Sequence, residues 1–228
     1  MSAADFGIGI YTPSEAARMV GMHSATLRRW LCGYAHDGRQ EQPLWNPQHV
    51  RDADNELLLG FRDVVEARII LALRRKGIGL PTIRLCLERA KNIVADERPF
   101  STRQFKTDGK TIFLEIVRGI NEPELIDLRK RQGVFKRVVE PSLEDLDFGP
   151  AGAERWWLLP KRRTIVADPA FSFGQPIIAE YGIATATVRD ALKAEGSVAR
   201  VTKIYEIPAK LIRDALLYEQ GEDVRRAA

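Results

Sequence analysis

The sequence predicts a mainly helical α+β fold, with helical regions at both ends and a middle segment that contains β-strands. Three observations predict this fold. Residues 11–31 hold two amphipathic stretches separated by Gly21, and residues 185–220 hold three more. In residues 103–116, on either side of Asp108 and Gly109, the polarity of the side chains follows a period of two. Apolar residues that recur every three or four positions indicate helices, whereas alternation indicates strands.

Residues 11–31 predict a helix-turn-helix. Thr12 or Ser14 can cap the first helix, and Pro13 suits its first turn, where no amide hydrogen is needed. Gly21 ends that helix where the turn requires a positive φ. We expect Ser24 to cap the second helix. Its inward positions would be Leu27, Trp30 and Leu31, and its outward positions Ser24, Ala25, Arg28 and Arg29.

The second helix of such a motif enters the major groove of DNA. There an arginine can donate two hydrogen bonds to guanine, and small polar residues reach base edges or phosphates. The alternative is an ordinary pair of antiparallel helices whose arginines are solvated.

The next stretch predicts a small wing followed by two helices. Residues 43–45 are consistent with one strand of the wing. Residues 61–76 have a helical period that ends at Gly77, and Pro81 opens another helix with Ile83, Leu87 and Ala90 on one side.

The middle segment predicts strands. Residues 103–107 and 110–116 flank Asp108-Gly109, a strong short-range signal for a β-hairpin. We expect a short helix over 122–131, a strand over 132–139 and extended or looped chain over 143–159, with a break between the two halves at 149–152.

The last part predicts a compact tri-helical unit, again of the helix-turn-helix type. The helices would cover 185–194, 197–205 and 208–220, with Gly196 ending the first, Ser197 capping the second and Pro208 starting the third. The final helix would expose Lys210 and Arg213. The shared core would consist of Val188, Leu192, Val198, Val201, Ile204, Leu211, Ile212, Ala215 and Leu216.

Composition sets broad limits on function. A net charge of +4 and a pI near 9.1 over 228 residues permit nucleic-acid binding without requiring it. No run approaches the roughly 20 apolar residues that a bilayer needs, and the N-terminus lacks signal-peptide features, so we expect a cytoplasmic protein. We expect Cys32 and Cys86 to be small buried hydrophobes, and we predict no metal and no cofactor.

Residues 10–92 resemble the MerR-type winged helix-turn-helix family. The resemblance is carried by YTPSEAA at 11–17, TLRRW at 26–30, FRDV at 61–64 and the helix and turn over 73–84. It implies that Thr26, Arg28 and Arg29 lie at the groove, and that Phe61 and Arg62 begin the segment supporting a wing. The candidate DNA-binding residues are Thr12, Ser24, Thr26, Arg28, Arg29 and Arg62, together with Lys210 and Arg213 of the last helix.

Residues 160–221 resemble the small antitoxin-like family called domain of unknown function 433. The carrying motifs include IVADP at 165–169, FGQPII at 173–178 and GIATATV at 182–188. The combination of the two parts resembles VapB-type antitoxins of bacterial toxin–antitoxin operons. That resemblance implies a toxin with a PIN-domain ribonuclease fold, neutralised by direct binding, and autoregulation through operator DNA.

Such a toxin carries a carboxylate cluster, so an inhibitor gains by placing a cation against it. The candidate toxin-binding residues are Lys161, Arg162, Arg163, Arg225 and Arg226, among which the sequence does not choose. We expect a homodimer, alone or within a larger assembly with the toxin, because DNA half-sites about 34 Å apart require paired recognition helices.

Two other functions are alternatives to an antitoxin. A transcription regulator could hold a small ligand among Phe105, Phe113, Phe135, Trp156 and Trp157, although such aromatics are more often core. Enzymatic activity is not predicted, because His23, His36 and His49 lack matched catalytic partners. The predicted domains are 1–95 (DNA-binding), 96–160 (β-containing connection) and 161–228 (tri-helical).

Overall fold

The computed structural model describes residues 8–36, 39–49, 56–117 and 139–221. The chain divides into two units, which we call the N-terminal unit (Tyr11–Ala153) and the C-terminal unit (Glu154–Ala228 with Met1–Ile10). Residues of the predicted connecting segment, 96–160, occur in both units. The architecture is a mixture of helices and small antiparallel sheets, which confirms the predicted fold class.

The N-terminal unit opens with two helices joined by a tight turn. Helix α1 (Pro13–Val20) begins with a capping box, in which the Thr12 hydroxyl accepts from the Glu15 amide while the Glu15 carboxylate accepts from the Thr12 amide. Gly21 ends α1 with φ 78°, as predicted. Helix α2 (Ser24–Cys32) is capped by the His23 ring, whose Nδ1 accepts from the Ala25 amide at 3.3 Å. The prediction that Ser24 provides this cap was therefore wrong by one residue.

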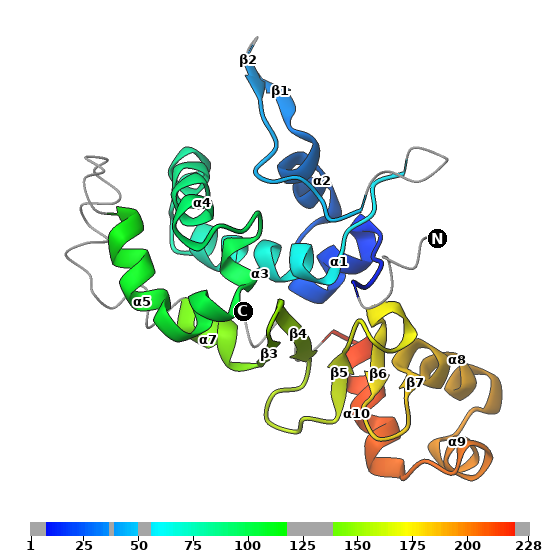
Figure 1. The fold of residues 1–228 in the computed structure, drawn as a ribbon. Coiled ribbons are helices and arrows are strands. Elements are labelled where there is room, and N and C mark those ends of the chain that lie inside the picture. The colour runs from blue at the N-terminus through cyan, green and yellow to red at the C-terminus, as the bar shows by residue number, and fades with distance from the viewer. Residues whose placement is uncertain (1–7, 37–38, 50–55, 118–138, 222–228) are drawn as a thin grey trace. The chain divides into compact units, whose positions relative to one another are not determined.

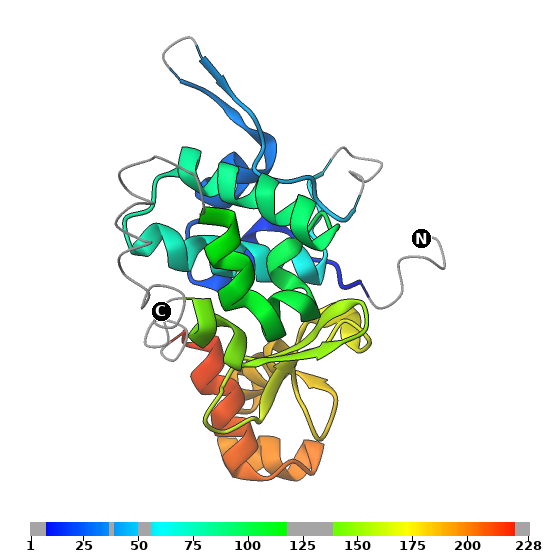
Figure 2. The same ribbon diagram turned by 60° about the vertical axis from the view of Figure 1, so that its left-hand side comes forward.

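A hairpin follows α2, formed by β1 (Tyr34–His36) and β2 (Arg39–Glu41) in antiparallel register, with Tyr34 opposite Glu41. Figures 1 and 2 show this hairpin extending away from α1 and α2. The wing strand predicted at 43–45 was misplaced, because those residues form the bend by which the chain returns from the hairpin. Leu44 and Trp45 are buried there.

Helices α3 (Phe61–Arg75) and α4 (Leu80–Val94) confirm the two helices predicted after the wing. Gly77 has φ 85° in the link between them, and Pro81 lies in the first turn of α4. Ile83, Leu87 and Ala90 are buried on α4, as predicted.

The hairpin predicted over 103–116 is wrong. A 3₁₀ turn, η2 (Pro99–Ser101), leads into helix α5 (Arg103–Val117), and the Thr102 hydroxyl accepts from the Phe105 amide at 3.1 Å at its start. The buried positions Phe105, Gly109, Ile112 and Ile116 are spaced four, three and four residues apart, and α5 packs against α4 along this face. Burial along a helical period thus outweighs the turn preference of Asp108-Gly109.

After α5, the next described elements are helix α7 (Glu140–Glu144) and strand β3 (Leu146–Gly149). Residues 143–159 were predicted to be extended or looped, and residues 146–149 and 152–157 of this stretch form strands. The helix and strand expected over 122–139 lie outside the described residues, except for Val139, which is buried beside α7.

The larger sheet has the order β3-β4-β5-β6-β7, where β4 is Gly152–Trp157, β5 Ile165–Ala167, β6 Pro176–Ile178 and β7 Ile183–Ala184. Strands β4 to β7 pair antiparallel; Trp157 lies opposite Val166, and Val166 lies opposite Ile177. The short 3₁₀ turn η4 (Ser172–Gly174) connects β5 to β6.

Helices α8 (Thr185–Glu195), α9 (Val198–Tyr205) and α10 (Ala209–Glu219) confirm the three predicted C-terminal helices. Gly196 ends α8 with φ 71°, and the Ser197 hydroxyl caps α9. Val188, Val201, Leu211, Ile212 and Ala215 are buried, as expected.

Ile204 was predicted to join that core, but its side chain is 55% exposed. The inward face of α9 runs through Val198, Val201 and Tyr205, of which Val201 is fully buried. Ile204 falls at the margin of this face, in the last turn of a short helix. The spacing alone could not locate that margin.

The cysteine prediction was half correct. Cys86 is buried on α4, where burial raises the pKa of its thiol to about 11. Cys32, the last residue of α2, is exposed.

Glu66 on α3 carries a titratable group in the core of the N-terminal unit. It is 1% exposed, its Oε1 accepts from the Ser101 amide at 2.8 Å, and its Oε2 has no hydrogen-bond partner among the described residues. Burial raises the pKa of Glu66 from 4.5 to about 8, although the Ser101 hydrogen bond and the charge of Arg62 act in the opposite direction. The folded state therefore holds a proton at Glu66 near neutral pH.

We predict that the free energy of unfolding falls as the pH rises from about 4.5 to about 8. Over that range the unfolded chain releases the Glu66 proton while the folded chain retains it, so raising the pH favours unfolding. Urea denaturation should show a loss on the order of 3 kcal/mol for this group between pH 5 and pH 8.5. Glu66→Gln keeps the acceptor for Ser101 and should remove this part of the pH dependence. An E66Q variant that follows the wild-type curve would contradict the assignment.

Candidate nucleic-acid interface

Helix α2 separates its residues into a buried and an exposed face, as predicted. Leu27, Trp30 and Leu31 are buried against the rest of the N-terminal unit. Ser24 is half-buried, and the exposed positions are Ala25, Thr26, Arg28 and Arg29. The two arginines therefore extend into solvent from a helix whose other side is fixed in the core.

The two arginines differ in their surroundings. The Arg29 guanidinium lies over the Tyr34 ring, 4.2 Å from its centroid, so it is held against the first strand of the hairpin by a cation–π interaction. The Arg28 guanidinium makes no hydrogen bond or ion pair with any residue that the structure describes. Arg28 is thus available to a ligand, while Arg29 also joins α2 to the hairpin.

Three sets of contacts fix the base of the hairpin. Gly33 has φ 70°, and a Cβ at this position would lie 2.3 Å from the Glu41 carbonyl oxygen, so only glycine fits. The Leu44 amide donates to the Trp30 carbonyl at 2.8 Å. Arg84 of α4 donates to the carbonyl oxygens of Gln42 and Pro43, each at 2.9 Å, and pairs with Glu41 at 3.3 Å. The stem of the hairpin is therefore tied to α2 and to α4.

Asp63 anchors the chain that returns from the hairpin. Its fully buried carboxylate accepts from Trp45 Nε1 (3.1 Å), the Gln48 amide (2.7 Å), the Gly60 amide (2.8 Å) and Arg98 Nε (2.6 Å). Four donors from three segments of chain thus converge on one side chain.

Arg62, a predicted DNA contact, is engaged within the protein. Its guanidinium donates to Ser101 Oγ (2.8 Å), Asp96 Oδ1 (2.7 Å) and the Arg98 carbonyl (2.9 Å), and its side chain is 18% exposed. This arginine ties α3 to the segment before α5, and we leave it out of the interface proposed below.

The other predicted contacts have varied surroundings. Thr12 is exposed, and its hydroxyl belongs to the capping box of α1. Lys210 and Arg213 are exposed on α10, in the C-terminal unit. The structure therefore does not bring them together with α2 in one unit.

The predicted toxin-binding residues also divide. Lys161, Arg162 and Arg163 are all exposed, but Arg162 also pairs with the buried Asp214 of α10. The Arg163 guanidinium lies 4.6 Å from the centroid of a Trp157 ring. Arg225 and Arg226 lie outside the described residues.

The aromatic residues considered for a ligand pocket are divided between the two units. Phe105 belongs to the N-terminal unit, where it is buried against Phe100 with ring centroids 4.9 Å apart. Trp156 and Trp157 belong to the C-terminal unit. Phe135 and the side chain of Phe113 lie outside what the structure describes.

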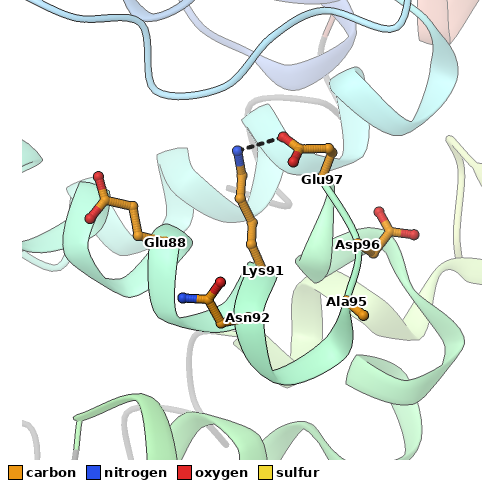
Figure 3. Close-up of a pocket in the computed structure, with 6 residues that line it drawn as sticks. All are labelled: Glu88, Lys91, Asn92, Ala95, Asp96 and Glu97. Atoms are coloured by element: carbon orange, nitrogen blue, oxygen red, sulfur yellow. Dashed lines mark hydrogen bonds and ion pairs between the residues drawn. The ribbon is translucent and has the colours of Figure 1, made fainter.

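A hollow of about 550 Å³ lies at the C-terminal end of α4 (Figure 3). Its charged groups are largely engaged: Lys91 pairs with Glu97 at 2.8 Å, and Asp96 accepts from Arg62 and from the Arg98 amide. We assign no ligand to it. Across residues 8–36, 39–49, 56–117 and 139–221, no group of three His, Cys, Asp or Glu side chains is placed to hold a metal ion. The residues that line the hollow at the end of α4 are Glu88, Lys91, Asn92, Ala95, Asp96 and Glu97.

Comparisons with known proteins found a family model, a named relative and a solved structure. A family model described as a protein of unknown function, DUF433, matches residues 165–218. A Mycobacterium tuberculosis protein named "Putative antitoxin VapB45" is 27% identical over 227 residues, with 92% of this chain and 94% of that protein covered. A crystal structure of the M. tuberculosis protein Rv2018 has a TM-score of 0.74 and 26% identity, over 90% of this chain and 96% of that one.

The match to DUF433 falls on strands β5 to β7 and helices α8 to α10, that is, on most of the C-terminal unit. The resemblance of residues 10–92 to MerR-type regulators stays a prediction. Among the helices that the structure describes, none is both long enough and apolar enough to cross a membrane.

Sequence reasoning missed the residues that hold the hairpin. Asp63, Arg84 and Arg98 are separated from their partners by 15 to 52 residues along the chain. A buried aspartate three positions after Gly60 is a local signal, because it can cap α3, but its other partners have no signature in the sequence.

We predict that Asp63→Ala destabilises the protein by about 3–5 kcal/mol, because it leaves Arg98 and three other donors without their shared acceptor. Urea denaturation measures this loss. Glu88→Ala, which removes an exposed carboxylate from α4, is the matched control and should change stability by less than about 0.5 kcal/mol. Equal stabilities for the two variants would show that Asp63 does not anchor the unit.

Proposed function

We propose that this chain is the antitoxin of a bacterial toxin–antitoxin pair and that it binds operator DNA to regulate its own transcription. The similarity to a protein named as an antitoxin, over nearly the whole of both chains, supports the first part. The exposed arginines of α2 beside a fixed hairpin support the second.

The DNA-binding part is proposed to be a winged helix-turn-helix of the MerR kind within residues 11–92. Helix α2 would lie in the major groove with Ser24, Thr26 and Arg28 toward bases or phosphates, and Arg29 toward the backbone beside the wing. The exposed face of α2 is the observation that carries this proposal, because its opposite face is fixed by buried Leu27, Trp30 and Leu31.

The partner is proposed to be a ribonuclease toxin with a PIN-domain fold, neutralised by direct contact. The carboxylates of such a nuclease would attract an exposed cation, and Lys161 and Arg163 remain candidates. We propose a homodimer for DNA binding, because paired half-sites require two recognition helices. The chain itself is proposed to have no catalytic activity.

We predict that Arg28→Ala weakens binding to duplex DNA from the region upstream of this gene by about tenfold or more. If the lost contact is to phosphate, the slope of log K against log salt should also fall by about 0.9. Gel shifts at several salt concentrations measure both. Lys193→Ala removes an exposed charge from α8 and serves as the control. An R28A variant that binds like the control would show that α2 does not contact DNA.

Arg29 allows a separate arm of that experiment. If Arg29 acts partly through the wing, Tyr34→Ala should weaken binding and should also reduce the additional effect of Arg29→Ala. Tyr34→Phe keeps the ring and should bind like wild type. Additive effects of R29A and Y34A would assign Arg29 to direct contact alone.

We predict that co-expression of this chain restores growth to cells that express the product of the adjacent gene, and that the two proteins co-purify. The same product should cleave RNA in magnesium, and adding the chain should stop cleavage. Growth arrest that the chain does not relieve would contradict the antitoxin role. RNA cleavage by the chain alone would contradict the absence of catalysis.

A further inference from the structure

The two units present different kinds of surface. In the part of the chain that the structure describes, the large hydrophobic side chains that are exposed all belong to the C-terminal unit: Phe171 (55%), Phe173 (49%), Tyr181 (39%) and Ile204 (55%). Interfaces between proteins are enriched in aromatic residues and arginine, whereas surfaces that bind a DNA backbone are dominated by cations and polar groups. The C-terminal unit therefore has the character of a protein-binding unit.

Three segments meet at one end of the sheet in this unit. The loop between β4 and β5 is joined to the turn between β6 and β7 by a hydrogen bond from the Ala179 amide to the Thr164 carbonyl, at 3.0 Å. The same loop is joined to α10, because Asp214 pairs with Arg162 and accepts from the Thr164 hydroxyl at 2.9 Å. Lys210 lies one helical turn before Asp214 and is exposed.

We call this surface the basic edge and define it by Lys161, Arg163, Tyr181 and Lys210, all of which are exposed. Lys161 and Arg163 are predicted toxin contacts, and Lys210 is a predicted DNA contact. These three residues thus share one surface. Arg162 forms an ion pair with Asp214 and so links the loop between β4 and β5 to α10.

Arg163 is presented in a costly backbone conformation. Its φ is 48°, in the left-handed region that non-glycine residues rarely adopt, and its amide donates to the Leu159 carbonyl at 2.7 Å. The guanidinium lies over Trp157, so the charge is held near the edge by the ring. This arrangement pre-positions a cation and an aromatic side chain together.

The two lysines of the edge differ from other cations of the unit, which form ion pairs. Arg155 pairs with Asp168 at 2.6 Å, and Arg189 pairs with Glu219 at 2.7 Å. Lys161 and Lys210, by contrast, form no ion pair with any residue that the structure describes. The edge is therefore complementary to an acidic surface.

We propose that the basic edge is the docking surface for an acidic protein partner, so that the C-terminal unit binds protein while the N-terminal unit binds DNA. The inference rests on the proposed antitoxin function and assigns its partner contact to this edge. A second copy of the chain would set like charges against one another across a two-fold axis. Duplex DNA suits this edge less well, because the exposed ring of Tyr181 offers a contact typical of protein interfaces and not of a phosphate backbone.

The first test compares single charge reversals in the full chain. Lys161→Glu and Lys210→Glu should each weaken binding to the adjacent-gene product by about tenfold or more, measured by calorimetry. Lys193→Glu on α8 makes the same change in charge and should have little effect. All three should bind the upstream duplex alike. If the edge variants lose DNA affinity while keeping the protein partner, the edge is a DNA contact and the proposal is wrong.

A second test does not depend on which protein the adjacent gene encodes. A photo-crosslinking residue, p-benzoylphenylalanine, in place of Tyr181 should form an adduct in cells with one protein whose surface is acidic, and Lys161→Glu should suppress that adduct. An adduct with a second copy, or no protein adduct, would overturn the proposal. An acidic adduct partner that is not a nuclease would support the docking surface and contradict the proposed toxin.

Discussion

The buried carboxylate of Asp63 is the interaction on which the N-terminal unit depends. It lies in the first turn of α3 and accepts one hydrogen bond from the start of that helix, two from the chain that returns from the hairpin, and one from Arg98. A buried charge without partners is strongly unfavourable, so the structure is stable only when all these segments are in place. The position of the return chain, and hence the stem of the hairpin, follows from this requirement.

Buried carboxylates organise the C-terminal unit in the same way. Asp214 joins α10 to the loop before β5, and Glu219 accepts from the Thr185 hydroxyl at 2.6 Å and from Arg189, which joins α10 to α8. Asp214 pairs with Arg162 of the cluster at 161–163, and Glu219 pairs with Arg189. Arg162 and Arg163 are adjacent in sequence, but Arg162 pairs with Asp214 whereas the Arg163 guanidinium lies over the Trp157 ring.

Local signals explain which parts of the fold were predictable. The cap of α1, for which Thr12 was one of two candidates, the helix ends at Gly21 and Gly196 and the period of α4 are each encoded within one helix length, and the structure confirms them. The helix α5 was missed because Asp108-Gly109 is also a local signal, and it was outweighed by burial of Phe105, Ile112 and Ile116. The internal role of Arg62 was missed because its partners are 34 to 39 residues away.

The hairpin bears on the choice between a winged helix-turn-helix and a plain pair of helices with solvated arginines. A plain pair needs nothing beyond its shared core, which Ala17, Val20 and Leu27 already supply. Here a glycine that admits no side chain, an arginine that donates to two carbonyls and a buried aspartate all act to fix a hairpin with no part in that core. Ordering a projecting segment costs conformational entropy, and the anchors at its base offset that cost. Because Arg29 of the exposed helix face packs on the first strand of the same hairpin, the anchors also determine where that guanidinium is held. A structure that fixes a cation-bearing helix and a hairpin relative to each other is suited to contact a duplex at two places, which a solvated pair of helices does not require.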